Sequence, residues 1–473
     1  MRQIRLLNHY INAAYIPLAL LEFGLLMGAA WAGVQLQFRN DPAQLAVQLT
    51  GSLPTFVAFA MVLSLMGFAM RVYPARFREG HTGMALRTLV AYFLLGGVAL
   101  SVLGALSVQF YLPQGVLLYA LPLALLAVSA LRYAFFALAD DGKLARRVIV
   151  LGAGQRARVL LERLGGKMQR PGLRIVGFVP GAGDEILLTA DVLLRPTADL
   201  LATAHETGAT EIVVAADERR SSEGGNYPLE KLLDCKLAGI AITDGVNFLE
   251  RELEKVEIDL VRPSWLVFSD GFRVSARRDV AKRSFDLLAS LTLLAVAWPF
   301  MLLTALAIWL ESGFRGPILY HQERVGFGGR TFMVAKFRSM RTDAEQAGKA
   351  VWAKANDDRV TRVGRFIRAT RLDELPQLWN IINGEMSFVG PRPERPQFTE
   401  ELAAQIPYFR ERLRVKPGLA GWAQLCFPYG ASVEDAAEKL RYDLFYIKNH
   451  TILMDLLILI QTVEVVLVGR GVR

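Results

Sequence analysis

Four apolar runs open the sequence, and each is close to the length that a helix needs to cross the hydrocarbon core of a membrane. They cover Tyr15 to Leu36, Leu53 to Met70, Thr88 to Leu112 and Gly115 to Leu131. The fourth run is short unless the helix continues through Arg132 to Leu138. An even number of spans returns the chain to its starting side, so residues 1–142 are predicted to form a four-span transmembrane bundle.

Positive charges lie on one side of these runs. They are Arg2 and Arg5 before the first run, Arg71, Arg76, Arg78 and Arg87 between the second and third, and Lys143, Arg146 and Arg147 after the fourth. The positive-inside rule therefore places both ends of the bundle in the cytoplasm. Glu22 lies within the first run, where it either has a function or, near a helix end, snorkels or packs against a neighbouring helix. Because charges inside the runs are rare, we expect a passive anchor rather than a transporter.

Composition narrows the choice of partner. The 473 residues are 53% hydrophobic and carry a net charge of +9, which suits anionic headgroups or anionic substrates. The cations flank apolar runs, and this placement favours lipid over nucleic acid. The chain contains two cysteines, Cys235 and Cys426, too few for a disulfide framework or a zinc site, so a reducing compartment is expected.

Residues 143–265 have the pattern of a soluble α/β module. A buried strand from Arg147 to Leu151 leads into Gly152-Ala153-Gly154 and a helix through Leu164, and further strands are expected at Leu173 to Val179 and Glu211 to Ala215. Strand, tight turn and helix in this order predict a Rossmann-like fold. The second strand does not end in the acid that would bind a ribose, so a structural or regulatory module is favoured over a dinucleotide site.

After a linker at 266–281, the apolar run Leu287 to Leu310 is long enough to span a membrane but has Pro299 at its centre. A full crossing would place the following cations outside, against the positive-inside rule. Proline also removes a backbone hydrogen bond and kinks a helix. A re-entrant hairpin over 287–310, which enters and leaves on the cytoplasmic face, satisfies both observations; a kinked spanning helix is the alternative.

Short strands are predicted at Pro317 to Gln322 and Thr331 to Phe337. Lys336 and Arg338 alternate with Phe337, so on a strand they share one face. This face either meets a phosphate or forms a cationic edge toward lipid headgroups, and the spacing alone does not separate the two.

The segment from Arg362 to Arg395 carries the strongest sign of chemistry. Adjacent carboxylates, Asp373 and Glu374, lie between a run of arginines that includes Arg368 and the rigid loop Pro391-Arg392-Pro393. Arginine forks match phosphate oxygens two at a time, so acids among arginines indicate a phosphorylated, metal-bound substrate. Thr370, three residues before Asp373, predicts a capping box, and Pro376 predicts a helix start at the acids. For an isolated acidic pair, cap charges on a solvated face would be the simpler interpretation.

The last third of the chain adds further candidates. Lys416-Pro417-Gly418 and Trp422 to Gln424 form a glycine-rich turn with a cation and an aromatic ring, which either stacks on a base or sugar or packs in the interior. Asp443 and Tyr446 lie one helical turn apart, and Asp443 is a candidate to orient a substrate group. The apolar stretch Ile452 to Val468 contains Asp455 and Glu464, which favours a helix in the membrane interface over a span.

Several ordered segments together resemble one family. They are KFRSM at Lys336 to Met340, RLDELPQLWNII at Arg371 to Ile382, GEMSFVGPRPE at Gly384 to Glu394 and KPGLAGWAQ at Lys416 to Gln424. These segments are similar to those of the bacterial sugar transferases, the monotopic polyprenyl-phosphate phosphoglycosyltransferases. The similarity covers about Lys282 to Arg473, and the whole-chain layout resembles the long, exopolysaccharide-priming members.

The resemblance implies transfer of a hexose 1-phosphate from a UDP-sugar to polyprenyl phosphate, with UMP as the second product. It implies Asp373 as nucleophile, Glu374 as ligand of Mg²⁺, and substrate contacts by Lys336, Arg338, Arg368, Pro391, Arg392, Pro393, Lys416, Trp422, Gln424 and Asp443. The membrane hairpin of the family is flanked by residues that match Lys282, Arg283 and Asp286, with Pro299 at the bend. The middle module of the family does not carry the transfer chemistry, and a homodimer through it is expected.

The expected fold is a membrane α/β protein: a four-helix bundle, a Rossmann-like module, and a mostly helical catalytic domain at 282–473 with a re-entrant hairpin and interfacial helices. The expected location is the bacterial inner membrane, with the catalytic domain on the cytoplasmic face. Three alternatives stay open: an NAD-dependent nucleotide-sugar-modifying enzyme, a noncatalytic membrane assembly or regulatory protein, and a multi-span lipid-phosphate transferase.

Overall fold

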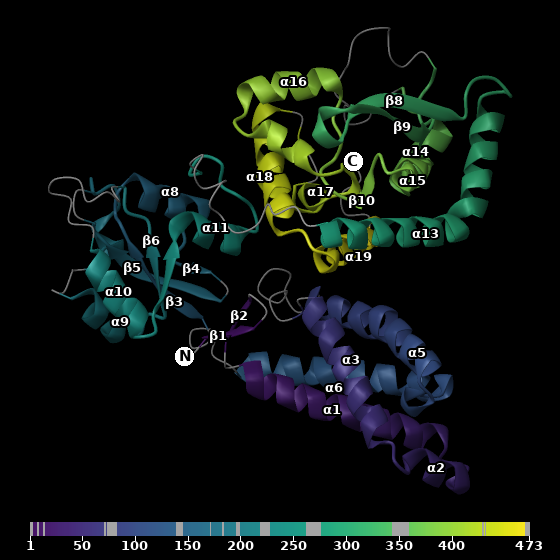
Figure 1. The fold of residues 1–473 in the computed structure, drawn as a ribbon, viewed down its shortest axis with the longest axis horizontal. Coiled ribbons are helices and arrows are strands. Elements are labelled where there is room, and N and C mark those ends of the chain that lie inside the picture. Colours follow the sequence, from purple (N-terminus) through teal and green to yellow (C-terminus); the bar gives the residue numbers. More distant parts are fainter. Residues whose placement is uncertain are drawn as a thin grey trace. The chain divides into compact units, whose positions relative to one another are not determined.

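The structure is a computed structural model of the full chain. It describes residues 3–6, 9–12, 15–70, 72, 83–138, 145–170, 172–181, 184–194, 199–217, 228–261, 276–342, 359–427, 430 and 432–468. The cations expected at 71–78 and most of the predicted linker lie outside the described residues. The chain divides into two compact units, Met1–Gly245 and Val246–Arg473, and Figure 1 shows their elements.

The first unit contains the apolar helices. They are α1 (Tyr15–Gln37), α2 (Pro42–Leu49), α3 (Leu53–Ala69), a helical stretch Gly83–Leu106 that includes a seven-residue π-helix at Val90–Gly96 and α5 (Gly97–Leu106), and α6 (Gln114–Leu138). Among the described residues, four helices of the whole chain are long and apolar enough to cross a membrane: α1, Gly83–Leu106, α6 and α13 of the second unit. The pair α2 and α3, bent by 71°, would make a fifth span.

The bundle is held together by close packing and by one buried ion pair. At Gly33 of α1 a side chain would meet the Cβ of Ala120 on α6 at 2.8 Å, so glycine lets these two helices approach closely. The fourth helix does continue past Leu131, and this extension brings Arg132 into the bundle. Its Nε and Nη2 donate to the two carboxylate oxygens of Glu22 at 2.7 Å each, and Nη1 donates to Thr88 Oγ1 at 2.7 Å. Glu22 therefore packs against a neighbouring helix, one of the two outcomes expected for it.

The first unit also contains a two-stranded antiparallel sheet, β1 (Gln3–Leu6) with β2 (His9–Asn12), and a five-stranded sheet. The strands of the five-stranded sheet are β3 (Arg146–Leu151), β4 (Gln169–Arg170), β5 (Leu173–Val179), β6 (Glu211–Val214) and β7 (Ala241–Asp244). The order is β4-β5-β3-β6-β7, and every neighbouring pair is parallel except β4 with β5. Helices α8 (Gln155–Arg163), α9 (Leu200–Thr207) and α10 (Leu229–Leu237) accompany the sheet. The predicted strands and helix lie where the sequence placed them.

The turn that a dinucleotide phosphate would need is filled by the protein's own acids. Asp217 accepts hydrogen bonds from the backbone nitrogens of Gln155 and Arg156 at the start of α8, at 2.7 and 2.8 Å. Asp184 accepts from Ala153 N at 2.9 Å. Two carboxylates thus occupy the amide groups that would otherwise attract an anion.

The boundary between the units falls at the first residue of α11 (Gly245–Leu253). The elements that follow in the second unit are α13 (Ala276–Glu311), β8 (Leu319–Val325), β9 (Thr331–Phe337), α14 (Arg362–Ala369), η5 (Leu372–Glu374), α15 (Gln377–Asn383), β10 (Ser387–Val389), α16 (Pro396–Gln405), η6 (Phe409–Arg414), β11 (Gly418–Ala420), α17 (Trp422–Cys426), α18 (Val433–Asn449) and α19 (Ile452–Val468). Strands β8 and β9 form an antiparallel hairpin, and β10 pairs in parallel with β11. Val256 and Ile258, which fall within the predicted middle module 143–265, pack in the same core as Leu444 of α18.

Candidate active site

The two acids lie in one turn of 3-10 helix, η5, directly before α15. Arg371 starts this turn in the left-handed region, with φ of 59°. The expected capping box is wrong, because the Thr370 hydroxyl donates to Phe366 O at 2.9 Å and so belongs to the end of α14. Leu375 and Pro376 have helical dihedral angles, so the turn runs on into α15. The acids therefore stand at a helix start, as predicted.

Glu374 is held between two cations. Its side chain is buried, Arg392 Nη2 donates to Oε1 at 2.8 Å, and Lys336 Nζ lies 3.6 Å from the same oxygen. Burial by itself would raise the pKa of Glu374, but the positive charges of Arg392 and Lys336 outweigh it and hold the pKa well below its usual range. Glu374 stays ionised at every physiological pH.

Asp373 meets different surroundings. Its Oδ1 atom is buried and has no hydrogen-bond partner among the described residues. Burial raises the pKa of Asp373 to about 6, the charge of Glu374 adds to this rise, and Lys336 acts against it. At pH 7 roughly 90% of this carboxyl is ionised. The site thus pairs a permanently charged acid with one that titrates close to neutrality, a difference typical of two carboxylates with different tasks.

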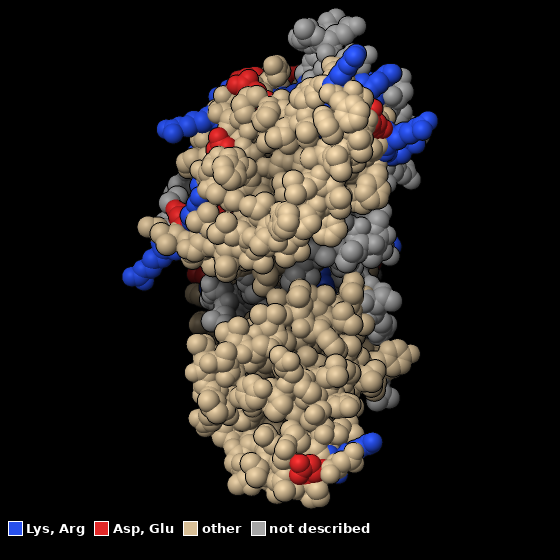
Figure 2. Space-filling model, turned by 90° about the vertical axis from the view of Figure 1, so that its right-hand side faces the viewer, with Lys and Arg blue, Asp and Glu red and all other residues tan. Residues whose placement is uncertain are grey.

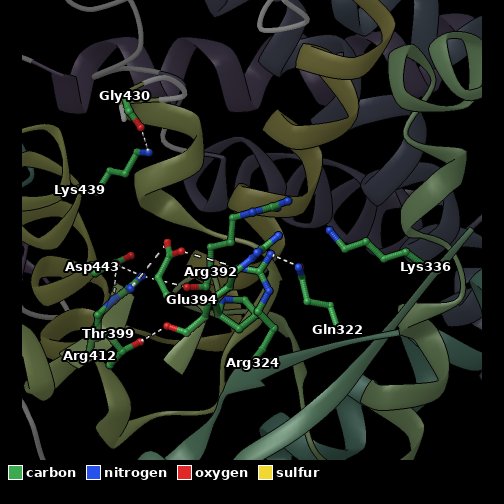
Figure 3. A network of polar contacts seen from close by, with 12 residues as sticks. Gln322, Arg324, Lys336, Arg392, Glu394, Thr399, Arg412, Gly430, Lys439 and Asp443 are labelled. Atoms are coloured by element: carbon green, nitrogen blue, oxygen red, sulfur yellow. Dashed lines mark hydrogen bonds and ion pairs between the residues drawn. The ribbon is translucent and has the colours of Figure 1, made fainter. Parts of the chain in front are cut away.

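The loop Pro391-Arg392-Pro393 is fixed by bonds to its backbone. Arg412 Nη2 donates to Arg392 O at 2.9 Å, and Arg324 Nη1 donates to Pro393 O at 3.1 Å. Figure 3 shows these side chains converging on the loop, while Lys336 reaches in from β9. At Gly390 a side chain would meet Lys416 O at 2.4 Å, so glycine permits the close approach of the neighbouring segment. Arg392 is therefore aimed at Glu374 by a rigid support.

Asp443 belongs to this support rather than to the acid pair. It is 2% exposed and accepts from Arg412 Nε at 3.2 Å and from Nη2 at 2.9 Å. Burial raises the pKa of Asp443 to about 6, although Arg412 acts in the opposite direction. Glu394 completes the group, since it lies 3.8 Å from Arg324 and 3.9 Å from Arg412. The contacts make Asp443 a positioning residue for the loop.

Three residues of this support were not predicted from the sequence: Arg324, Arg412 and Glu394. Arg324 lies in β8 and Arg412 in η6, and neither stands in a pattern that distinguishes it from the other cations of a basic chain. Burial lowers the pKa of Arg324 to about 10, which identifies it as a desolvated cation, but only the tertiary structure reveals this.

The other predicted site residues lie in several places. Arg368 acts on Asp373 through its charge. The backbone nitrogen of Arg338 donates to Ile318 O at 2.9 Å. Trp422 Nε1 donates to Glu254 O at 3.0 Å, and its ring lies 6.4 Å from that of Phe445, so this tryptophan packs in the interior. The Oε1 atom of Gln424 is buried without a hydrogen-bond partner in the described part of the chain.

Lys416 lies near the C-terminal end of α15 with Arg283. At Gly384 a side chain would lie 3.5 Å from Lys416 Nζ and 3.5 Å from Arg283 Nη2. Burial lowers the pKa of Lys416, and the neighbouring charge of Arg283 lowers it further.

The first part of α13 is anchored to the acid-bearing core by the three residues predicted to flank the hairpin. Arg283 donates to Ile381 O and Ile382 O at 2.6 Å each. Asp286 accepts from Ser387 Oγ and Phe388 N at 3.0 Å each. Lys282 pairs with Asp455 of α19 at 2.7 Å, and Asp455 is 1% exposed, so α19 packs its acid into the core.

The residues that the structure describes contain no group of three or more His, Cys, Asp and Glu side chains that could hold a metal ion. Two carboxylates do lie at the site. Magnesium prefers one or two carboxylates together with substrate phosphate oxygens and water, and the contacts of Glu374 to cations all involve Oε1. This donor set would fit Mg²⁺ if a ligand supplied phosphate oxygens as well.

A carboxylate pair lies among cations on a unit that also contains a long apolar helix, and this combination is typical of membrane-associated enzymes. Residues 277–469 match the family model described as bacterial sugar transferase. The chain is 42% identical over 187 residues to the UDP-glucose:undecaprenyl-phosphate glucose-1-phosphate transferase of Caulobacter vibrioides, and the match covers 39% of this chain and 69% of that protein. It is 40% identical over 192 residues to the exopolysaccharide production protein PSS of Rhizobium leguminosarum, covering 39% of this chain and 94% of that protein.

The chain therefore belongs to the bacterial sugar transferase family, as the sequence motifs predicted. It is also 39% identical over 260 residues to the UDP-N-acetylgalactosamine-undecaprenyl-phosphate N-acetylgalactosaminephosphotransferase of Aeromonas hydrophila, covering 55% of this chain and 60% of that protein. The match thus spans about 60% of the length of this relative.

Proposed function

We propose that this protein transfers hexose 1-phosphate from a UDP-sugar to polyprenyl phosphate, in the form of undecaprenyl phosphate, and so primes exopolysaccharide or other glycoconjugate synthesis. The observation that carries the proposal is the contrast between the acids: Asp373 keeps a buried oxygen without a partner, while Glu374 is bound by Arg392 and Lys336. Family membership supports it, as do relatives whose names specify undecaprenyl-phosphate sugar transfer.

Asp373 acts as the nucleophile in the first step. One carboxylate oxygen forms a bond to the sugar-bearing β-phosphorus, the bond from this phosphorus to the bridging oxygen breaks, and UMP leaves with that electron pair. A carboxylate needs no base to activate it when its pKa is about 6. In the second step an oxygen of polyprenyl phosphate attacks the same phosphorus and releases Asp373. No proton has to move in either step.

The cations stabilise the charge that develops during both steps. Two cations contact Glu374 from different elements: Arg392 lies in the loop after β10, and Lys336 lies in strand β9. Their positions are fixed before substrate binds, and preorganised charge is the main source of catalysis in phosphoryl transfer. Mg²⁺ held by Glu374 and the diphosphate would add Lewis-acid stabilisation of the phosphate oxygens.

A re-entrant insertion of α13 explains how a soluble donor and a lipid acceptor meet at this site. The beginning of α13 is bound to α15 and β10, and near its end Ile308 packs with Phe337 and Ile367. Glu311 also accepts from Val363 N at 3.1 Å. Between these anchors the large apolar side chains Trp298, Phe300, Leu302 and Leu303 are more than half exposed. The ribbon changes direction within α13 in Figure 1, and Figure 2 shows broad surfaces without charged side chains.

The NAD-dependent alternative is disfavoured by the middle module. Asp217 and Asp184 take the backbone amides at the turn before α8, and a dinucleotide phosphate placed there would meet two like charges. A noncatalytic role would not require Asp373 to remain buried without a partner, at a cost of about 1 to 3 kcal/mol.

The test uses the full chain in membranes supplied with polyprenyl phosphate and a series of radiolabelled UDP-sugars. The expected result is UMP release and a labelled lipid with at least one sugar, both reduced about 10³-fold or more in Asp373→Asn. When the enzyme without substitutions is given the UDP-sugar but no polyprenyl phosphate, labelled sugar phosphate should accumulate on the protein. This label should remain attached after the protein is denatured. Transfer that persists in Asp373→Asn, or native enzyme that never carries the label, would refute the covalent route.

A further inference from the structure

Gln377 is a buried polar residue that the mechanism above does not use. Its side chain is 4% exposed, and its Nε2 atom has no hydrogen-bond partner among the described residues. A buried donor without a partner costs about 1 to 3 kcal/mol. Native structures contain few such groups, and each calls for an explanation such as a missing ligand.

The contacts of neighbouring residues show which way this part of the chain faces. Residues three and four apart lie on one side of a helix. Glu374, three residues before Gln377, lies 3.6 Å from Lys336 of β9. Asn380, three residues after it, accepts from Ala335 N at 3.1 Å and donates to Met333 O at 2.8 Å, both on the same strand. Gln377 therefore lies on the β9-facing side, between these two anchoring contacts.

The helical path between the acids and Gln377 is continuous. Leu378 N donates to Leu375 O at 3.0 Å, and Trp379 N donates to Pro376 O at 3.1 Å. These bonds join residues three apart, so Gln377 shares a side of the turn with Glu374, and Asp373 is the immediate neighbour of Glu374 in the same turn. Asp373 Oδ1 and Gln377 Nε2 are both buried without partners, so they do not bond to each other. A group attached to Asp373 that brings acceptor oxygens would satisfy both.

We propose that Gln377 is a further catalytic residue, whose Nε2 donates a hydrogen bond to a non-bridging oxygen of the phosphoryl group while that group is bonded to Asp373. This inference rests on the proposed function. Gln377 transfers no proton: the Asp373 oxygen forms its bond to phosphorus, UMP leaves with the electron pair, and the amide stabilises the added negative charge. A third cation at this position would pair with Glu374. A neutral amide donates its hydrogen bond without forming such a pair.

The test compares Gln377→Met, which keeps the length of the side chain and removes the donor, with Gln377→Glu, which replaces the donor by a negative charge. Gln405→Met and Gln405→Glu on the exposed side of α16 are matched controls. Full-length variants in membranes are assayed for UMP release and for UMP exchange into UDP-sugar, and their thermal unfolding is followed.

In Gln377→Met we expect kcat for UMP release to fall 10- to 100-fold with KM changed less than threefold, because the bond forms in the transition state. The unfolding temperature should stay the same or rise, since an unpaired buried donor is removed. Gln377→Glu should be less active still, and the Gln405 variants should stay within twofold of native.

Three outcomes would overturn the inference: Gln377→Met within twofold of native activity, a loss that follows a lowered unfolding temperature, or a rise in KM alone. Each requires an active native enzyme. If native protein released no UMP from any UDP-sugar, the proposed function would fail first, so the two failures are distinguishable.

Discussion

Asp373 and Glu374 are adjacent in the chain but experience opposite electrostatic surroundings. Burial raises the pKa of Asp373 to about 6, whereas Arg392 and Lys336 overcome burial at Glu374 and lower its pKa. The difference arises because two cations approach the oxygen of one acid and leave the other acid with an unpartnered buried oxygen. In the proposed mechanism Glu374 holds a cation and Asp373 attacks phosphorus.

Asp373→Asn should abolish transfer and stabilise the fold at pH 8. The folded-state pKa of Asp373 lies above its usual value of 3.8, so the stability that this group contributes is fully present below pH 3.8 and is lost as pH rises through about 6. Asparagine suffers no such loss. The difference corresponds to at most about 3 kcal/mol. Thermal unfolding of both proteins at pH 5 and pH 8 should show a larger gain in stability of Asp373→Asn at pH 8. The same variant should be inactive in the transfer assay.

The direction in which the stability difference between Asp373→Asn and the unsubstituted protein changes with pH tests this explanation. A gain that is larger at pH 5 than at pH 8, or an unfolding temperature lowered at pH 8, would mean that the Asp373 carboxylate is stabilised in the folded protein. Glu400→Gln is a suitable comparison, because Glu400 is exposed and pairs with Arg410 at the surface. It should change stability by less than about 1 kcal/mol at either pH.

At the scale of elements, the position of the loop after β10 depends on side chains from three other elements: β8, η6 and α18. Arg324 from β8 and Arg412 from η6 donate to its carbonyl oxygens, and Asp443 from α18 holds Arg412. A loop has no regular hydrogen bonds of its own, so buried side chains supply them. The position of Arg392 is therefore set by residues that do not touch the acids.

Asp443→Asn should reduce both activity and stability. The substitution removes the charge that neutralises buried Arg412, and loss of one partner of a buried ion pair costs roughly 3 kcal/mol. We expect kcat/KM for UMP release to fall 10- to 100-fold, because Arg392 shifts relative to Glu374. Chemical denaturation and steady-state kinetics measure the two effects. Unchanged kinetics in a destabilised variant would show that the pair supports the fold without positioning the loop.

These elements also show what the sequence could and could not predict. The first two apolar runs, strands β5 and β9, and helix α19 follow from local periodicity, and their bounds agree with the structure to within one residue. The third helix ends at Leu106 rather than at Leu112, and the fourth continues past Leu131 to Leu138. The acids and the Pro-Arg-Pro loop were found from residue types in a short segment. Asp443 lies 31 residues from Arg412, and Trp422 lies 168 residues from its acceptor at Glu254, so no local pattern indicates either bond.

At the scale of the whole molecule, α13 decides how the second unit meets the membrane. It has 36 residues and would be about 54 Å long if straight. Its beginning and its end are both anchored to the acid-bearing core, at Ile381 and Ile382 through Arg283 and at Val363 through Glu311. A membrane crossing between the two anchors would require this core to lie on both sides of the bilayer.

Single cysteines should therefore show that both ends of α13 lie on the cytoplasmic side. Arg277→Cys and Arg315→Cys are introduced separately into a chain with Cys235→Ser and Cys426→Ser. Both positions are exposed. A membrane-impermeant maleimide should label both in inside-out vesicles and neither in right-side-out vesicles, because a re-entrant helix returns to the side from which it entered. Val108→Cys, at a position 89% exposed between the third and fourth apolar helices, should show the opposite labelling. Labelling of Arg315→Cys from outside, with Arg277→Cys labelled from inside, would establish α13 as a crossing helix and remove the structural basis for an acceptor site at the cytoplasmic interface.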